Sequence, residues 1–174
     1  VPTQAAWTAG KEALDKLVAA HAAKTGAVPT KFTFSLWSVE TMRHQGLLEA
    51  QALWALGVQP VWDAGGRVVD VKLVPRKELG RARIDVVLSA TGLYRDHFPN
   101  AMKQLARAAQ LAAQADDEAD NPVARNATAI AAQLVAQGWR AKPAQQAAQT
   151  RIFSGSSGNY GTGLDNAALA TDTW

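Results

Sequence analysis

The sequence of 174 residues contains no cysteine. Disulfides, thiolate nucleophiles, cysteine-ligated zinc and iron–sulfur clusters are therefore excluded from this chain, because each of them needs a thiol. Long apolar runs are also missing, since the longest uncharged stretches are rich in alanine and are interrupted by glutamine and asparagine. None of them approaches the roughly 20 apolar residues of a membrane-spanning helix, so we expect no membrane span.

The sequence has little excess of one charge sign. Lys and Arg together number 18 against 15 Asp and Glu, which gives a formal net charge of +3. So small an excess does not make a dense basic face, and we expect no nucleic-acid binding. Hydrophobic residues make up 48% of the chain and charged residues 19%, which is typical of a folded domain with a core. The length fits one domain.

The first residues lack an initiator methionine, a basic leader and a long apolar segment. The sequence starts at Val1 and stops at Trp174. We therefore expect a cytoplasmic protein, and we expect this chain to be a fragment of a longer polypeptide.

Hydrophobic periodicity predicts an alternation of helices and strands. The fourth strand is short and mostly apolar, as central parallel strands are. The second and third strands flank a turn and predict a hairpin or an added edge strand. The predicted fold class is α/β: one domain over 1–174 with a largely parallel sheet flanked by helices, and a helical and glycine-rich C-terminal part. Helices are expected over 3–24, 40–56, 99–115, 121–138 and from 143, and strands over 31–37, 58–62, 67–73, 84–89 and 151–153.

Two loops that follow predicted strands carry the same polar set: a carboxylate, an arginine and a histidine. One loop spans 38–46 and the other 91–99. Functional loops gather at the carboxyl ends of parallel strands, so both loops open on one edge if their strands are neighbours. Arginine binds carboxylates through a bidentate fork, and histidine and glutamate exchange protons near neutral pH. The candidates for a site that handles an acidic ligand are Glu40, Arg43, His44, Arg95, Asp96 and His97.

Other interpretations of these polar residues stay open. In each loop the arginine also fits a structural ion pair with the neighbouring carboxylate at a helix end. His44 and His97 are weak metal-ligand candidates, because two ligands without a third are not a site. The acidic run 116–120 lacks the alternating ligands and the glycine of a calcium loop, which favours a solvated turn. The glycine-rich segment 155–163 lacks the Lys-Ser/Thr ending of a phosphate-binding loop and favours a surface or docked loop.

Longer strings of residues resemble a known protein family. The resemblance covers roughly residue 30 to the end of the sequence. The strings are Trp37, the Glu-Thr-Met-Arg of 40–43, Gly46, the segments 51–63 and 78–87, the Thr-Gly-Leu-Tyr-Arg-Asp-His-Phe-Pro of 91–99, and the Arg-Ile-Phe of 151–153 with Gly158, Tyr160 and Gly161. Together they resemble the large subunits of aerobic cobaltochelatase and of magnesium chelatase.

This resemblance implies insertion of a divalent metal ion into a tetrapyrrole, coupled to ATP hydrolysis by separate AAA+ partner subunits. The large subunit binds the macrocycle, the metal ion is a substrate, and ATP belongs to the partners, so no resident cofactor is expected in this chain. In the cobalt branch the macrocycle is hydrogenobyrinic acid a,c-diamide, on the aerobic route to cobalamin. In the magnesium branch it is protoporphyrin. The segments 61–63 and 94–99 favour cobalt.

The sequence departs from the family at two points. The family's His-Gly-Thr-x-Glu-Trp segment, where the catalytic histidine and glutamate are expected, is not in this sequence. We therefore expect it upstream in the intact subunit and expect no chelatase activity from this chain alone. Ala82 stands where the family has a proline between two arginines, which leaves Arg81 and Arg83 in place.

The resemblance adds Tyr94 to the candidates and implies that they form part of the wall of a tetrapyrrole site. Arg43 and Arg95 are then expected to pair with ring carboxylates, and His44 and His97 to touch the metal or the ligand. Two other functions stay open: a structural domain that docks on the AAA+ subunits, and a nucleotide-binding module that uses the glycine-rich segment.

Overall fold

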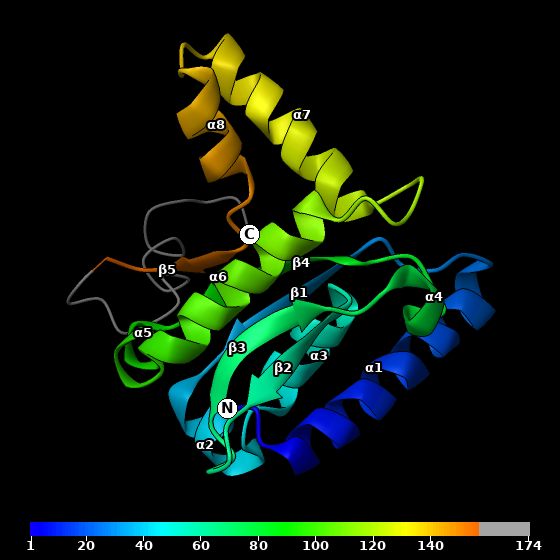
Figure 1. The fold of residues 1–174 in the computed structure, drawn as a ribbon, viewed down its shortest axis with the longest axis vertical. Helices are drawn as coiled ribbons and strands as arrows, with labels where there is room; N and C mark the ends of the chain where they lie inside the picture. Colours follow the sequence, from blue (N-terminus) through cyan, green and yellow to red (C-terminus); the bar gives the residue numbers. More distant parts are fainter. Residues whose placement is uncertain (157–174) are drawn as a thin grey trace, which may run out of the picture.

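The structure is a computed structural model that describes residues 1–156. Three of its strands pair in parallel in the order β1-β4-β5, with helices around them (Figure 1). The predicted α/β class with a largely parallel sheet flanked by helices is confirmed. Of the glycine-rich segment 155–163, all but the first two residues lie outside the described part. The elements are α1 (Gln4–Thr25), β1 (Lys31–Leu36), α2 (Ser38–His44), α3 (Leu47–Ala55), β2 (Val58–Trp62), β3 (Val68–Leu73), α4 (Arg76–Leu79), β4 (Asp85–Ala90), α5 (Gly92–His97), α6 (Pro99–Gln114), α7 (Pro122–Ala136), α8 (Ala141–Ala148) and β5 (Ile152–Ser154).

β4 is the central strand, as its mostly apolar sequence predicts. It pairs with β1 along the whole length of both strands, starting at Lys31↔Asp85, and its second half pairs with β5. Both pairings are parallel, so each needs a long crossover connection. The first crossover carries α2, α3, the β2–β3 hairpin and α4, and the second carries α5 to α8. As a result, the three strands end at the same edge of the sheet.

β2 and β3 form an antiparallel hairpin with a bulge between Val61 and Trp62. Of the two expected arrangements the hairpin is confirmed, and it forms a sheet separate from β1, β4 and β5. Asp63 holds the turn, because its Oδ1 accepts the backbone N–H groups of Gly65 and Arg67 at 2.9 Å each. The hairpin packs against α6.

The single helix expected over 40–56 is wrong, because the chain forms two helices, α2 and α3. Gln45 (φ 56°) and Gly46 (φ 91°) both adopt the left-handed backbone conformation between them. A side chain at position 46 would clash, since a Cβ there would lie 2.7 Å from Pro2 Cα. His44 ends α2 by accepting two following backbone N–H groups at its Nδ1.

The second predicted loop, 91–99, is also mostly helical. Thr91 caps α5, and its hydroxyl accepts the backbone N–H of Tyr94 at 3.2 Å. α6 begins at Pro99, a first helical position that favours proline. The basic turn after β3 likewise contains the short helix α4. Helices as short as α4 and α5 have too few turns to show a hydrophobic period, so the sequence patterns missed them.

One face of the parallel sheet is covered by α3 and α6, and α1 packs on the outer side of α3. The residues of β1 and β4 that are buried on this face are Phe34, Leu36, Val86, Leu88 and Ala90. Edge-to-face tryptophans hold α1 in place: the ring of Trp7 lies 6.0 Å from that of Trp54 and 6.4 Å from that of Trp62. In Figure 1, α7 and α8 form a helical hairpin that projects from this body.

No helix within residues 1–156 is long and apolar enough to cross a membrane.

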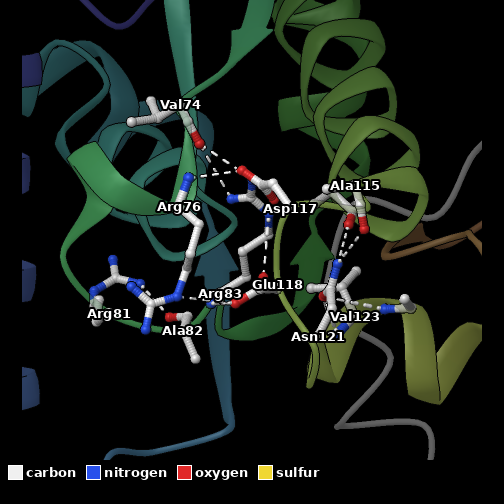
Figure 2. Close-up of polar contacts among 12 residues, drawn as sticks. Val74, Arg76, Arg81, Ala82, Arg83, Ala115, Asp117, Glu118, Asn121 and Val123 are labelled. Atoms are coloured by element: carbon white, nitrogen blue, oxygen red, sulfur yellow. Dashed lines mark hydrogen bonds and ion pairs between the residues drawn. The ribbon is translucent and has the colours of Figure 1, made fainter.

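The acidic run 116–120 pairs with a buried arginine (Figure 2). Arg83 is fully buried, and its Nη2 donates to Asp117 Oδ1 at 2.9 Å and to the carbonyl of Val74 at 3.1 Å. Its Nε lies 3.4 Å from Glu118 Oε1. The solvated turn expected for this run holds for Asp117, which stays exposed, but is wrong for Glu118, whose side chain is only 5% exposed. Their carboxylates neutralise a guanidinium that would be costly to bury alone.

A second buried ion pair joins β4 to β5. Arg151, which directly precedes β5, donates from Nε to Asp85 Oδ1 at 2.6 Å, and both side chains are buried. Asn126 of α7 donates to Asp85 Oδ2 at 2.7 Å. Arg151 Nη1 also donates to the carbonyl of Ala148 at 2.7 Å. One carboxylate thus connects the start of β4 with α7 and with the start of β5.

Replacing Asp85 by alanine leaves the Arg151 guanidinium buried without its carboxylate. Breaking a buried ion pair in this way should lower the free energy of unfolding by about 3–5 kcal/mol. The control is Asp120→Ala, which breaks an exposed ion pair with Arg125 and should cost less than about 1 kcal/mol. Urea denaturation followed by tryptophan fluorescence measures both variants, and equal losses would contradict the role given to Asp85.

Stability at acid pH should depend on Asp117. Its pKa lies below the ordinary value of 3.8, because the carboxylate accepts the backbone N–H of Arg76 and faces the Arg83 guanidinium. A lowered carboxyl pKa stabilises the fold above the unfolded-state value, and that stabilisation is lost as the pH falls through the folded-state value. Asp117→Asn should therefore be less stable than wild type at neutral pH, and the difference should shrink below pH 3.8. Thermal unfolding across this range is the measurement, and a difference that stays constant with pH would contradict the assignment.

Candidate functional site

The carboxyl ends of β1, β4 and β5 meet at one edge of the sheet, and α2 and α5 begin there. The two predicted loops are therefore side by side. A direct contact joins them: Ser38 Oγ, in the first turn of α2, lies 2.7 Å from Nδ1 of His97, at the end of α5. We refer to α2, α5 and residues 155–156 together as the carboxyl edge.

Glu40 and Arg43 lie on the exposed side of α2. Arg43 Nη1 donates to Glu40 Oε1 at 2.9 Å, and the exposed fractions of the side chains are 72% for Arg43 and 48% for Glu40. Residues three apart on a helix are neighbours on one face. An ion pair this exposed adds little stability, so the guanidinium can exchange Glu40 for another carboxylate at small cost.

Arg95 is more firmly engaged than Arg43. Its Nε donates to Asp96 Oδ1 at 2.9 Å, and its Nη1 donates to the carbonyl of Gly155 at 2.7 Å. Gly155 follows the last residue of β5, so Arg95 ties α5 to the end of that strand. This geometry matches the structural interpretation of the Arg95–Asp96 pair and leaves Asp96 exposed.

The two histidines have different environments. His44 Nδ1 accepts backbone N–H groups from Gly46 and Leu47 at 3.3 and 3.0 Å, which places the proton of the neutral ring on Nε2. That Nε2 is buried and has no hydrogen-bond partner among the described residues. The neutral His44 ring therefore presents no free lone pair to a metal. His97 is exposed and contacts Ser38. Within residues 1–156, no group of three or more histidines and carboxylates could hold a metal ion.

Tyr94 lies in the core beneath the carboxyl edge. Its side chain is fully buried, and its ring centroid lies 5.2 Å from that of Phe98. Burial raises the pKa of the hydroxyl, and the nearby Glu49 carboxylate raises it further. Tyr94 therefore stays protonated and holds α5 on the core, away from any ligand at the surface.

Glu49 is a buried carboxylate that the sequence patterns did not single out. It lies in α3, and its Oε1 accepts the hydroxyl hydrogen of Thr41, in α2, at 2.8 Å. Its Oε2 and the Tyr94 hydroxyl are buried close to one another, and neither makes a hydrogen bond of normal geometry in the described part of the chain. The one available signal was a carboxylate within an apolar helical run. The Thr41–Glu49 contact fixes α2 on α3 and so positions the face that carries Arg43.

A cavity of about 560 Å³ lies away from the carboxyl edge, between α7, α8 and the end of α6. Its lining is mainly alanine, with Thr128, Gln145 and Gln149 as its polar members. None of the predicted site residues lines it. The side chains that can bind ions or move protons are therefore at the carboxyl edge and not in this cavity.

The comparisons with known proteins all point to the same family. The model of the family described as CobN/Magnesium Chelatase matches residues 1–174. The chain is 36% identical over 165 residues to the aerobic cobaltochelatase subunit CobN of Sinorhizobium sp., covering 94% of this chain and 13% of that protein. It is also 36% identical over 176 residues to the chloroplastic magnesium-chelatase subunit ChlH of Oryza sativa subsp. japonica, covering 100% of this chain and 12% of that protein.

A solved structure shows the same fold. The catalytic subunit of cobaltochelatase from Mycobacterium tuberculosis superposes with a TM-score of 0.83 at 36% sequence identity. The match covers 100% of this chain and 14% of that chain. The chain thus spans about one seventh of the length of the proteins it matches.

The contact beneath the carboxyl edge can be tested with a double-mutant cycle. Thr41→Val removes the hydroxyl that donates to Glu49 and should lower the free energy of unfolding by about 2–3 kcal/mol, because a buried carboxylate loses its donor. Combining it with Glu49→Leu replaces both groups by apolar ones and should recover most of that loss. Urea denaturation of the wild type, both single variants and the double variant measures the coupling. A double variant no more stable than Thr41→Val would contradict the pairing.

Proposed function

Because the chain belongs to the CobN/magnesium chelatase family, we propose that its carboxyl edge forms part of the wall of the tetrapyrrole site in a chelatase large subunit. The reaction of the whole subunit is then insertion of a divalent metal ion into the macrocycle. The role of this chain in that reaction is to bind and orient the macrocycle. The wall residues are Glu40, Arg43, Arg95, Asp96 and His97, and His44 and Tyr94 support the wall from below.

The observation that carries this proposal is the exposed Arg43–Glu40 pair on α2. Tetrapyrroles of this class carry ionised carboxylates on their rim, and a guanidinium binds a carboxylate through two parallel hydrogen bonds. Arg43 is 72% exposed, so a ligand can reach it. Its helix is fixed from below by the Thr41–Glu49 contact, so little ordering is needed when a ligand binds.

The other candidate residues of the tetrapyrrole site have supporting roles. Arg95 and His97 position the edge, since the first holds Gly155 and the second contacts Ser38. Asp96 is exposed beside them. Tyr94 and His44 act from below the surface, where each has a buried polar atom. Proton removal from the pyrrole nitrogens needs a base, which we assign to the family's catalytic segment. That segment is not in this sequence, so we expect no metal insertion by the chain alone.

We place the chain in the cobalt branch, with hydrogenobyrinic acid a,c-diamide as macrocycle in cobalamin biosynthesis. The support is the Val-Trp-Asp of 61–63 and the Tyr-Arg-Asp-His-Phe-Pro of 94–99. Overall identity does not separate the branches, because the cobalt and magnesium relatives are both 36% identical to this chain. Magnesium insertion into protoporphyrin is the alternative.

We assign ATP hydrolysis to AAA+ partner subunits. Docking on companion subunits is a second candidate function, and the projecting α7–α8 hairpin supports it (Figure 1). Ile130 and Val135 of α7 are exposed, as apolar side chains of a protein-binding surface would be. The cytoplasmic location expected from the sequence stays a prediction.

Binding of a carboxylated tetrapyrrole tests the proposal. Arg43→Ala should weaken protoporphyrin binding by about tenfold or more, because a hydrogen bond to a charged group contributes about 1.5–3 kcal/mol. Arg125→Ala is the matched control, since it removes an exposed, ion-paired guanidinium from α7. Absorbance titration measures both. With the dimethyl ester of protoporphyrin, which has no carboxylates, the Arg43 effect should disappear. A wild-type chain that binds no tetrapyrrole, or equal affinities for the two variants, would overturn the proposal.

A further inference from the structure

One face of the parallel sheet is left open by the part of the chain that the structure describes. Side chains alternate along a strand, and the face opposite the core carries Thr33 and Ser35 of β1, Val87 and Ser89 of β4 and Phe153 of β5. Thr33 and Ser35 are exposed, Ser89 is half-buried and Phe153 is 52% exposed. Parallel sheets are almost always covered on both faces. Within residues 1–156, this face is therefore left for a ligand or for another part of the polypeptide to cover.

Trp37 belongs to the same face. It follows β1 with an extended backbone (φ −111°, ψ 133°), so the alternation of side chains continues from Ser35 to Trp37. Its side chain is 47% exposed. The opposite end of the face is closed, because Asn126 and Arg151 cover Asp85 there. The open part is thus the half next to the carboxyl edge.

The pairing register places the open half of this face between the side chains of Trp37 and Phe153. Ser35 is opposite Ser89, and Ser89 is opposite Phe153, so the three lie in one row across the sheet. Strands are about 4.8 Å apart, which puts Phe153 about 10 Å from Ser35. Trp37 lies two residues beyond Ser35, just past the end of β1. We refer to Ser35, Trp37, Ser89 and Phe153 as the sheet platform.

We propose that one face of the tetrapyrrole ring lies on the sheet platform, between Trp37 and Phe153. This inference rests on the proposed function and adds where the ring itself is held. Aromatic side chains pack favourably against conjugated rings, and the span between the two side chains is wider than a single pyrrole ring. The serine hydroxyls of the sheet platform can donate to or accept from the central nitrogens of the macrocycle.

Charge supports the same occupant. No member of the sheet platform is charged, which suits the apolar centre of the ring. The guanidinium of Arg95 lies at its border, where Nη1 donates to the carbonyl of Gly155, two residues beyond Phe153. An uncharged platform with the exposed Arg95–Asp96 ion pair at its border fits a ligand with an uncharged ring and a carboxylate rim, because a rim carboxylate can replace Asp96 at the guanidinium. A covering protein helix would bury the row of serine hydroxyls against apolar side chains, which is unfavourable unless each finds a partner.

Titration of the 174-residue chain with protoporphyrin tests the platform. Trp37→Ala and Phe153→Ala should each weaken binding by about tenfold, because each removes an aromatic contact with the ring. Ser89→Trp should weaken it at least as much by filling the sheet platform. The matched control is Trp139→Ala, since Trp139 is also 47% exposed but lies between α7 and α8; its affinity should equal that of wild type. Thermal unfolding checks that every variant is folded.

The outcomes separate the two proposals. If Arg43→Ala weakens binding while both aromatic variants and Ser89→Trp bind as wild type does, the tetrapyrrole wall stands and the platform is overturned. If wild type binds neither protoporphyrin nor hydrogenobyrinic acid a,c-diamide, both proposals fall. A second readout uses tryptophan emission, which a bound porphyrin quenches. Trp37→Phe should remove a larger share of the quenched emission than Trp139→Phe, and the reverse order would overturn the platform.

Discussion

The buried Asp85–Arg151 ion pair is the interaction on which the arrangement of the carboxyl edge depends. β1 is held to β4 by a ladder of six residue pairs, whereas β5 has a ladder of three. So short a strand adds little pairing energy of its own. Arg151 directly precedes it and is fixed by Asp85 at one end of β4. This contact brings β5 to the sheet in register, and only then can Gly155 reach Arg95 at the other end.

The carboxyl edge combines a fixed underside with an open surface. Beneath it, Thr41 and Glu49 connect α2 to α3, and Tyr94 anchors α5 in the core. Above it, Arg43 is held by an exposed ion pair that can be exchanged. A binding surface gains affinity when its side chains are already in place before the ligand arrives. The buried polar groups therefore serve binding through position and not through contact.

Much of the fold could be predicted from local patterns. The apolar run of β4 predicted a central parallel strand, and the sequence predicted that the two polar loops meet if their strands are neighbours, which β1 and β4 are. The predictions failed where a single backbone conformation decides the structure. The break between α2 and α3 depends on left-handed Gln45 and Gly46, and on the packing of Pro2 against position 46. No periodicity marks such a contact between residues distant in the sequence.

The sequence by itself determined the fold class, the parallel strands and the family, because hydrophobic period and ordered strings of residues are properties of the chain alone. Only the tertiary structure decided which polar residues are available. Tyr94 is buried in the core, and Arg95 is hydrogen-bonded to Gly155. Asp117 and Glu118 pair with the buried Arg83. Arg43 and Trp37 stay exposed. The physical reason is that burial and pairing are set by segments far apart in sequence. Identical residue types in two similar loops therefore acquire different roles.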